Sequence, residues 1–203
     1  MSATRHIDRI HGSGIVLRGD NIDTDRIIPA RFLKAVTFEG LGDHVFEDDR
    51  IAMPDHPFSD SRYSQAKLLL VNENFGSGSS REHAPQALKR WGIIGCIGES
   101  FSEIFQGNSL AIGLVCVTAS HDEVAWLMDH VEQNPSAQLQ LSVSNLMVQT
   151  GDQVLSVEMP EPARHALLNG HWDPTGLLLD RFEEVQAVSR KLPYIDGFVE
   201  TES

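Results

Sequence analysis

The sequence predicts an α/β fold, a single β/β/α domain over residues 1–203. Short apolar runs alternate with helical patterns between residues 68 and 133, which is typical of layered βα units. After Pro135 the pattern changes to alternating apolar and polar residues, as in antiparallel strands. Hydrophobic residues make up 41% of the chain, enough to fill a core of this size.

The first expected strand, Gly14–Leu17, leads into a turn-rich segment. Residues 34–65 are rich in Gly, Asp and Pro and are typical of a long functional or mobile loop. Strands and helices then alternate, with strands expected at residues 68–71, 93–97 and 114–118 and helices at residues 82–91, 102–105 and 122–133. In the last of these helices the apolar side chains recur on one face, which indicates ordinary core packing.

The second half predicts an antiparallel meander followed by helices. Strands are expected at residues 139–143, 146–148 and 154–157, with a turn at residues 150–152. A helix over residues 161–169 should end at Gly170, because glycine readily adopts the left-handed conformation of a helix C-terminus. Helical segments over residues 173–179 and 181–191 precede a tail, residues 192–203, that we expect to fray.

Charge and composition exclude several classes of function. A formal net charge of −13 repels nucleic acids and anionic membrane surfaces. The apolar run at residues 110–117 is too short to span a bilayer, and the N-terminus lacks the apolar region of a secretory signal. Cys96 and Cys116 lie in strand-like runs and are expected to be buried free thiols of a cytoplasmic protein, or one in a stroma-like compartment. Two thiols are too few for an iron–sulfur cluster.

The most informative segment is Asn74–Trp91, NFGSGSSREHAPQALKRW. A strand, a glycine turn and a helix N-terminus together form an anion site, and Arg81 adds a fork suited to a carboxylate. The blander readings are a flexible Gly-Ser turn or a capping box from Ser79 to Glu82. Pro85 disfavours that box, because it would lie inside the helix. The spacing fits neither a phosphate-binding loop nor a GxSxG elbow.

Two motifs together carry a family resemblance: NFGSGSSREHAP and, earlier in the chain, GDNIDTDRIIPARFLK at Gly19–Lys34. The chain resembles the small subunits of 3-isopropylmalate dehydratase, the detached swivel domain of the aconitase superfamily. This resemblance implies a swivelling domain of the aconitase C-terminal type and a hydro-lyase of leucine biosynthesis. It also implies a hydroxy-dicarboxylate substrate and a large-subunit partner that carries the [4Fe–4S] cluster, with no metal or cofactor on this chain.

The resemblance assigns roles by position. Ser79 matches the family's catalytic base, Asp25 an active-site carboxylate, and Ser80 and Arg81 the contacts to the substrate carboxylate. Glu82 and His83, which follow Arg81 in the same motif, are expected to lie behind the residues that contact the substrate or at an interface, and not to act as catalysts. Two alternatives stay open: turn capping by Asp23 or Asp25, and an Arg31 that faces either a carboxylate or solvent.

The substrate side chain is predicted from the aconitase loop WLKFR, whose arginine grips the third carboxylate of citrate. The matching stretch here includes Leu33 and Lys34, and the arginine position falls on Val36. A buried alkyl group is favoured beside Val36, whereas a carboxylate there would lose its hydration. Isopropylmalate is therefore favoured over citrate. The alternatives are a homoaconitate, citraconate or 2-methylmalate type of substrate, or a carboxylate-binding domain without catalysis.

Overall fold

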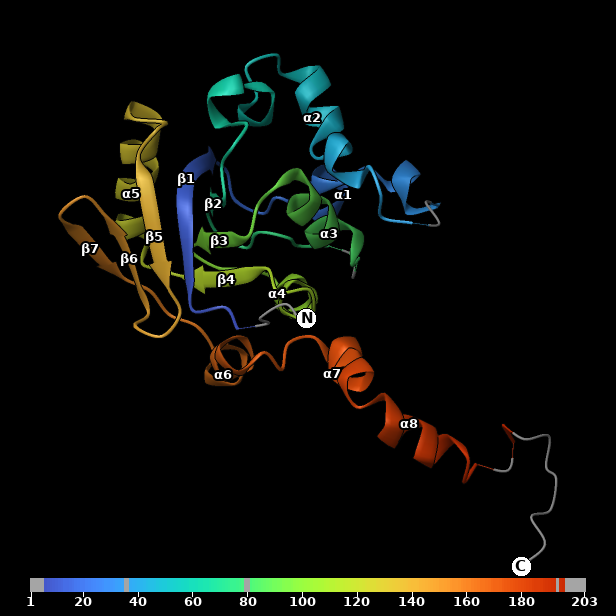
Figure 1. The fold of residues 1–203 in the computed structure, drawn as a ribbon. Helices are drawn as coiled ribbons and strands as arrows, with labels where there is room; N and C mark the ends of the chain where they lie inside the picture. The colour runs from blue at the N-terminus through green and yellow to red at the C-terminus, as the bar shows by residue number, and fades with distance from the viewer. Residues whose placement is uncertain (1–5, 35–36, 79–80, 193, 196–203) are drawn as a thin grey trace, which may run out of the picture. The chain divides into compact units, whose positions relative to one another are not determined.

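The computed structural model describes residues 6–34, 37–78, 81–192 and 194–195 (Figure 1). The chain forms two compact units, Met1–Trp172 and Asp173–Ser203. In the second unit, α7 (Pro174–Asp180) begins with Asp173, whose carboxylate accepts a hydrogen bond from Gly176 N, and α8 (Phe182–Ser189) follows. The predicted tail at residues 192–203 falls largely outside the described residues.

Among the described residues, the first unit contains a seven-stranded sheet in the order β4-β3-β2-β1-β5-β6-β7. Strands β1 to β4 are parallel, and β5 to β7 form an antiparallel meander beside β1. The strand bounds are β1 Arg9–Leu17, β2 Leu68–Val71, β3 Gly95–Gly98, β4 Val115–Thr118, β5 Gln138–Ser142, β6 Met147–Thr150 and β7 Gln153–Ser156. The predicted α/β fold is confirmed.

Helices cover both faces of the parallel strands, which explains why β2 reads as an unbroken apolar run. All four residues of β2 are buried. Helix α5 (His121–Gln133) packs on β1 and β2, and α3 (His83–Trp91) and α4 (Glu103–Ala111) lie on the other side of these strands in Figure 1. Helix α6 (Glu161–Asn169) ends at Gly170 in the left-handed conformation, as predicted.

The chain between β1 and β2 contains short helices and a well-packed aromatic cluster. Its helices are α1 (Thr24–Ile27), η1 (Ala30–Lys34), η2 (Leu41–His44), α2 (Glu47–Ala52), η3 (Pro57–Ser59) and η4 (Ser61–Tyr63). Phe58 packs between Phe46 and Trp91, with ring centroids 4.8 and 4.7 Å away. Helices this short hold too few residues to show a helical period, so the sequence pattern looks irregular.

Two predicted elements are shorter than the observed ones by five residues or more. β1 begins at Arg9 instead of Gly14, because its first residues pair with β5 through polar positions such as His11 and Ser13. Helix α4 continues to Ala111 instead of ending at Phe105. Its second half contains Gly107, a poor helix former that hides the pattern.

Cys96 and Cys116 are free and buried, as predicted. The two residues lie side by side on the neighbouring strands β3 and β4. A hydrogen bond with Cys116, together with burial, raises the pKa of the Cys96 thiol, which keeps it protonated and weakly reactive. Within the described ranges, no helix has the length and apolar character that a membrane span requires.

The turn after β2 depends on Gly76, and this predicts a loss of stability on substitution. Gly76 has a φ of 76°, and an added Cβ would lie 2.3 Å from the Phe105 ring. Gly76→Ala should lower the free energy of unfolding by about 2–4 kcal/mol through backbone strain and overpacking. Urea denaturation measures this loss.

The matched control is Gly107→Ala, at a helical glycine with open space around it. This variant should gain about 0.5–1 kcal/mol, because alanine restricts the unfolded chain and favours the helix. Equal stability of the two variants would contradict the steric account of Gly76.

Candidate functional site

The two sequence motifs meet where the parallel strands β1 and β2 end. We call residues 19–25 the aspartate loop and residues 72–78 the glycine loop. Val71 of β2 lies beside Leu17 of β1, so both loops leave the sheet at the same edge. Loops at the carboxyl ends of parallel strands are the usual ligand-binding positions of α/β sheets.

Backbone hydrogen bonds tie the two loops together beyond the strand ends. Gly76 N donates to Ile22 O at 2.8 Å, and Thr24 N donates to Ser77 O at 2.9 Å. Asp23 and Ser77 form a parallel bridge between these bonds. The loops are therefore an extension of the β1–β2 ladder and hold a defined register.

The turn after β3 holds the other side of the glycine loop. Phe75 N donates to Ser100 O at 3.1 Å, and Ser102 N donates to Phe75 O at 3.0 Å. The Ser102 hydroxyl donates to Gly76 O at 2.5 Å and also caps α4. The glycine loop is thus hydrogen-bonded along both edges, which restricts its backbone just before the two serines of the motif.

Asp25 and Arg81 form an ion pair that joins the two motifs. Asp25 lies inside α1, and an Nη of Arg81 donates to its carboxylate. The Asp25 side chain is 51% exposed and that of Arg81 is 20% exposed. Arg81 can therefore present part of its guanidinium to a carboxylate ligand while Asp25 orients it.

Other predicted site residues fall outside the described residues: Ser79, Ser80 and Val36. In sequence, the two serines lie between Gly78, with a φ of 91°, and Arg81. Leu33 is half-buried and Lys34 exposed at the end of η1, the segment that leads to Val36.

The helix after the serines begins at His83, with Glu82 as its N-cap residue. The capping box from Ser79 to Glu82 is therefore ruled out by the observed helix start, and Pro85 lies in the tolerated first turn. Glu82 accepts a hydrogen bond from the Gln86 amide at 2.8 Å, and the His83 ring contacts Phe38 edge-on at 5.1 Å.

The two alternatives left open by the sequence now have structural answers. Asp23 caps α1, since its carboxylate accepts a hydrogen bond from Arg26 N at 2.8 Å. Arg31 faces carboxylates of its own chain, with an Nη 2.8 Å from Asp48 and another 3.4 Å from Glu47. Asp25 thus remains the aspartate of the motif that pairs with Arg81.

Sequence reasoning missed the asparagines of the motifs. Asn21 and Asn74 have φ values of 56° and 54°, and their side chains are hydrogen-bonded at 2.8 Å. Just before the second motif, the Asn72 amide oxygen accepts a hydrogen bond from the N–H of Gly19, the first residue of the other motif, at 2.9 Å. The sequence did hold one signal for these turns, because asparagine, like Asp and His, adopts a positive φ more often than other non-glycine residues.

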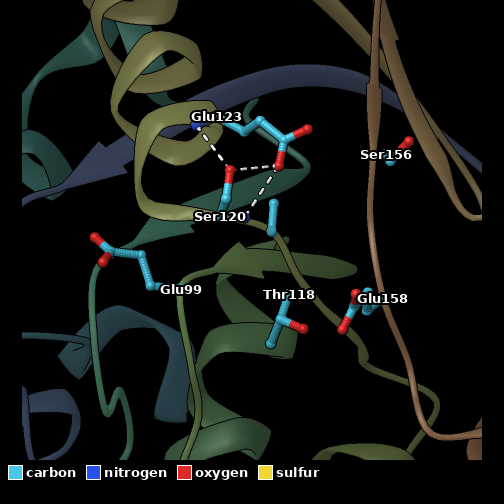
Figure 2. Close-up of a pocket in the computed structure, with 7 residues that line it drawn as sticks. Glu99, Thr118, Ser120, Glu123, Ser156 and Glu158 are labelled. Carbon is cyan, nitrogen blue, oxygen red and sulfur yellow. Dashed lines mark hydrogen bonds between the residues drawn. The ribbon is translucent and has the colours of Figure 1, made fainter.

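A separate hollow of about 320 Å³ lies at the carboxyl ends of β3 and β4 (Figure 2). The Ser120 hydroxyl, 2.6 Å from Glu123, and the Ser120 N–H hold the pKa of this carboxyl below its usual range. The negatively charged lining of this hollow would repel a carboxylate ligand, so the hollow is a poor site for a small acid. It is lined by Glu99, Thr118, Ala119, Ser120, Glu123, Ser156 and Glu158.

Comparison with known families places this fold and loop arrangement in a class. A family model described as the aconitase C-terminal domain matches residues 9–122, which include both motif loops. The class is thus that of aconitase-type C-terminal domains. Over the part of the chain that the structure describes, no cluster of three or more His, Cys, Asp or Glu side chains is placed to hold a metal ion.

Close relatives and a solved structure narrow the class. The chain is 49% identical over 190 residues to a 3-isopropylmalate dehydratase small subunit of Synechocystis sp., covering 93% of this chain and 95% of that protein. It is 49% identical to the Thermus thermophilus protein of the same name, covering 91% and 94%. The chain belongs to the family of 3-isopropylmalate dehydratase small subunits.

A crystal structure of 3-isopropylmalate dehydratase (leuD) from Methanocaldococcus jannaschii has the same fold. It superposes with a TM-score of 0.64 at 24% identity, covering 88% of this chain and 98% of the other.

The Asp25–Arg81 pair is expected to contribute little to stability. Asp25 is half exposed, and ion pairs at such positions are worth about 0.2–1 kcal/mol. Asp25→Asn should therefore change the free energy of unfolding by less than about 1 kcal/mol in urea denaturation. A larger loss would mean that the pair holds the fold together rather than preparing a site.

Proposed function

We propose that this chain is the small subunit of a 3-isopropylmalate dehydratase, a hydro-lyase of leucine biosynthesis. The reaction interconverts 2-isopropylmalate and 3-isopropylmalate through isopropylmaleate, by removing water and adding it back at the neighbouring carbon. The names of the relatives support the reaction. The observation that carries the proposal for this chain is the Asp25–Arg81 pair, which joins the first motif to the residue that follows the two serines in the second motif.

In this proposal Arg81 and Ser80 bind a carboxylate of the substrate, and Ser79 removes the proton from the adjacent carbon. A serine hydroxyl is far too weak an acid to ionise alone at neutral pH, so neighbouring donors and cations must stabilise its alkoxide. Arg81 follows Ser79 closely in the chain and supplies one such cation. Asp25 keeps the Arg81 guanidinium oriented between substrate turnovers.

In this proposal the leaving hydroxyl needs an acid, and the acid is supplied by another chain. A [4Fe–4S] cluster on the large subunit would act as the Lewis acid for that hydroxyl when it is bound. Cys96 and Cys116 are poor candidates for holding such a group, because both are buried on paired strands within the sheet. We therefore propose a site shared between two subunits of a cytoplasmic enzyme.

The substrate side chain is assigned to the end of η1 and the residues that follow it in the sequence. Leu33 is half-buried there, and Val36 replaces the arginine of the aconitase loop. Burial of an isopropyl group against such residues stabilises binding by about 1.5–3 kcal/mol. An additional carboxylate in the same place would lose hydration without a matching guanidinium. Lys34 is exposed at the edge of this segment and is proposed to contact the substrate.

The shared site predicts that activity requires both subunits. The purified chain alone should show no turnover of 3-isopropylmalate, and activity should appear after it is mixed with an anaerobically reconstituted large subunit. Ser79→Ala in the mixed enzyme should lower kcat by about 10²–10⁴-fold with little change in KM, because the variant removes the base.

Two results would contradict this proposal. Turnover by the metal-free chain alone would rule out a shared site. A near-normal kcat for Ser79→Ala would require another base. The control variant is Ser136→Ala, at an exposed serine in the turn before β5, which should leave both kinetic constants unchanged.

Competition kinetics test the substrate side chain. The wild-type pair should convert 2-isopropylmalate far better than citrate, and Val36→Arg should narrow this preference by about 10-fold or more, since a charged hydrogen bond contributes roughly 1.5–3 kcal/mol. Val36→Ile serves as the matched control and should keep the preference. Equal or better turnover of a tricarboxylate by the wild-type pair would refute the assignment.

A further inference from the structure

In the sequence, Ser79 and Ser80 are flanked by two residues whose side chains are tied to the aspartate loop, Asn74 before the serines and Arg81 after them. The outer tie is the ion pair of Asp25 with Arg81. The inner tie is the hydrogen bond from the Asn74 amide to the Asn21 amide oxygen, at 2.8 Å. Ser79 and Ser80 follow the inner tie and precede the outer one in the chain.

The backbone at both asparagines is committed to the same unusual conformation. Asn21 has a φ of 56° and Asn74 a φ of 54°, a region that asparagine tolerates better than most residues. Each residue also makes backbone bonds that depend on this turn. Asn21 N donates to Glu73 O at 2.9 Å, and Asn74 N donates to the Ser100 hydroxyl at 2.8 Å.

The inner tie therefore links the middle of the aspartate loop to the glycine loop beyond the strand ends. Asn21 O also accepts a hydrogen bond from the Ser77 hydroxyl at 3.4 Å, which links it to the end of the glycine loop. Asn21 is exposed and Asn74 is half-buried. The hydrogen bond between their side-chain amides therefore competes with water and is not part of the buried core. A conformational restraint on the loops accounts better for this pair than a contribution to the core.

Building on the proposed function, we propose that Asn21 and Asn74 are positioning residues that hold the serine base in reach of the substrate carbon. Neither residue needs to touch the substrate. They act through the backbone of the glycine loop, whose other edge is already bonded to the turn at Ser100. Misplacement of a reacting group by about 1 Å can lower a rate by about 10²-fold, so a modest restraint has a large kinetic effect.

The chemistry of the amide pair provides a specific test. Each amide carries both a donor and an acceptor, so either asparagine can donate once its partner becomes an aspartate. Asn21→Asp and Asn74→Asp should therefore each keep the tie and at least about half of the wild-type kcat. The double variant places two carboxylates face to face and should lose kcat by about 10²-fold, with KM changed by less than about 3-fold.

Two further variants separate the side-chain tie from the backbone conformation. Asn74→Gly permits a positive φ but removes the amide, and it should show the same loss of kcat as the double aspartate variant. The charge control is Asn134→Asp with Asn169→Asp, which adds two negative charges at exposed helix ends away from the loops. This control should keep wild-type kinetics.

Hydrogen exchange of the free, full-length chain tests the tie independently of catalysis. In the double aspartate variant and in Asn74→Gly, the amides of Gly76 and Thr24, which donate hydrogen bonds between the two loops, should exchange at least about 10-fold faster than in wild type, because the loops separate more often. The single aspartate variants should match wild type. If the wild-type pair lacked dehydratase activity but exchange followed this pattern, the proposed function would fail while the tie would stand.

Two results would overturn the positioning role. One is a double aspartate variant whose kcat and amide exchange equal those of the single variants. The other is wild-type kcat in Asn74→Gly, which would mean that the backbone conformation alone is needed.

Discussion

The parallel pairing of β1 with β2 is the constraint on which the site depends. The ladder does not stop at Leu17 and Val71 but continues through the bridge of Asp23 with Ser77. Residues that are far apart in the sequence thereby share one register, and Asp25 comes within reach of Arg81. A shift of this pairing by one residue would reverse the side chains of β2 and separate the two motifs.

The residues that stabilise the fold and the residues proposed for catalysis lie in different parts of the β1–β2 ladder and its loops. The strands are buried on both faces, and Gly76 is pressed against Phe105 where a larger residue has no room. The charged residues lie outside this packed region, where Asp25 is half exposed. A rigid scaffold with polar groups on its loops is the usual arrangement of an enzyme site, because positioning requires order and ligand access requires exposure.

Much of the fold could be predicted from local patterns. The strand Leu68–Val71 and the helix Glu161–Asn169 have the bounds that their apolar runs and the following Gly170 indicate. The start of β1 could not be read in this way, because its polar residues are stabilised by pairing with β5. The short helices between η1 and β2 lack a period, and their order comes from aromatic packing around Phe58.

The local pattern predicted an anion site with Arg81, and the family resemblance added the roles of the other site residues. The resemblance pointed to Asp25 and Arg81, but their ion pair depends on tertiary structure that no local pattern encodes. The asparagine pair was missed for the same reason, since an isolated asparagine reads as an ordinary turn residue. The local pattern of a capping box at Ser79 does not match the observed helix, which begins at His83. Pro85 is tolerated only in the first turn of a helix, and this favours the later start.

The position of β1 in the middle of the sheet also orders events during synthesis. This strand is translated before both of its partners, β2 and β5, and it joins the parallel and antiparallel halves of the sheet, where Ile10 pairs with Leu141. Its second edge stays unpaired until β5 has been translated. A strand with such a distant partner keeps an apolar edge open in the nascent chain, where unpaired strand edges favour aggregation.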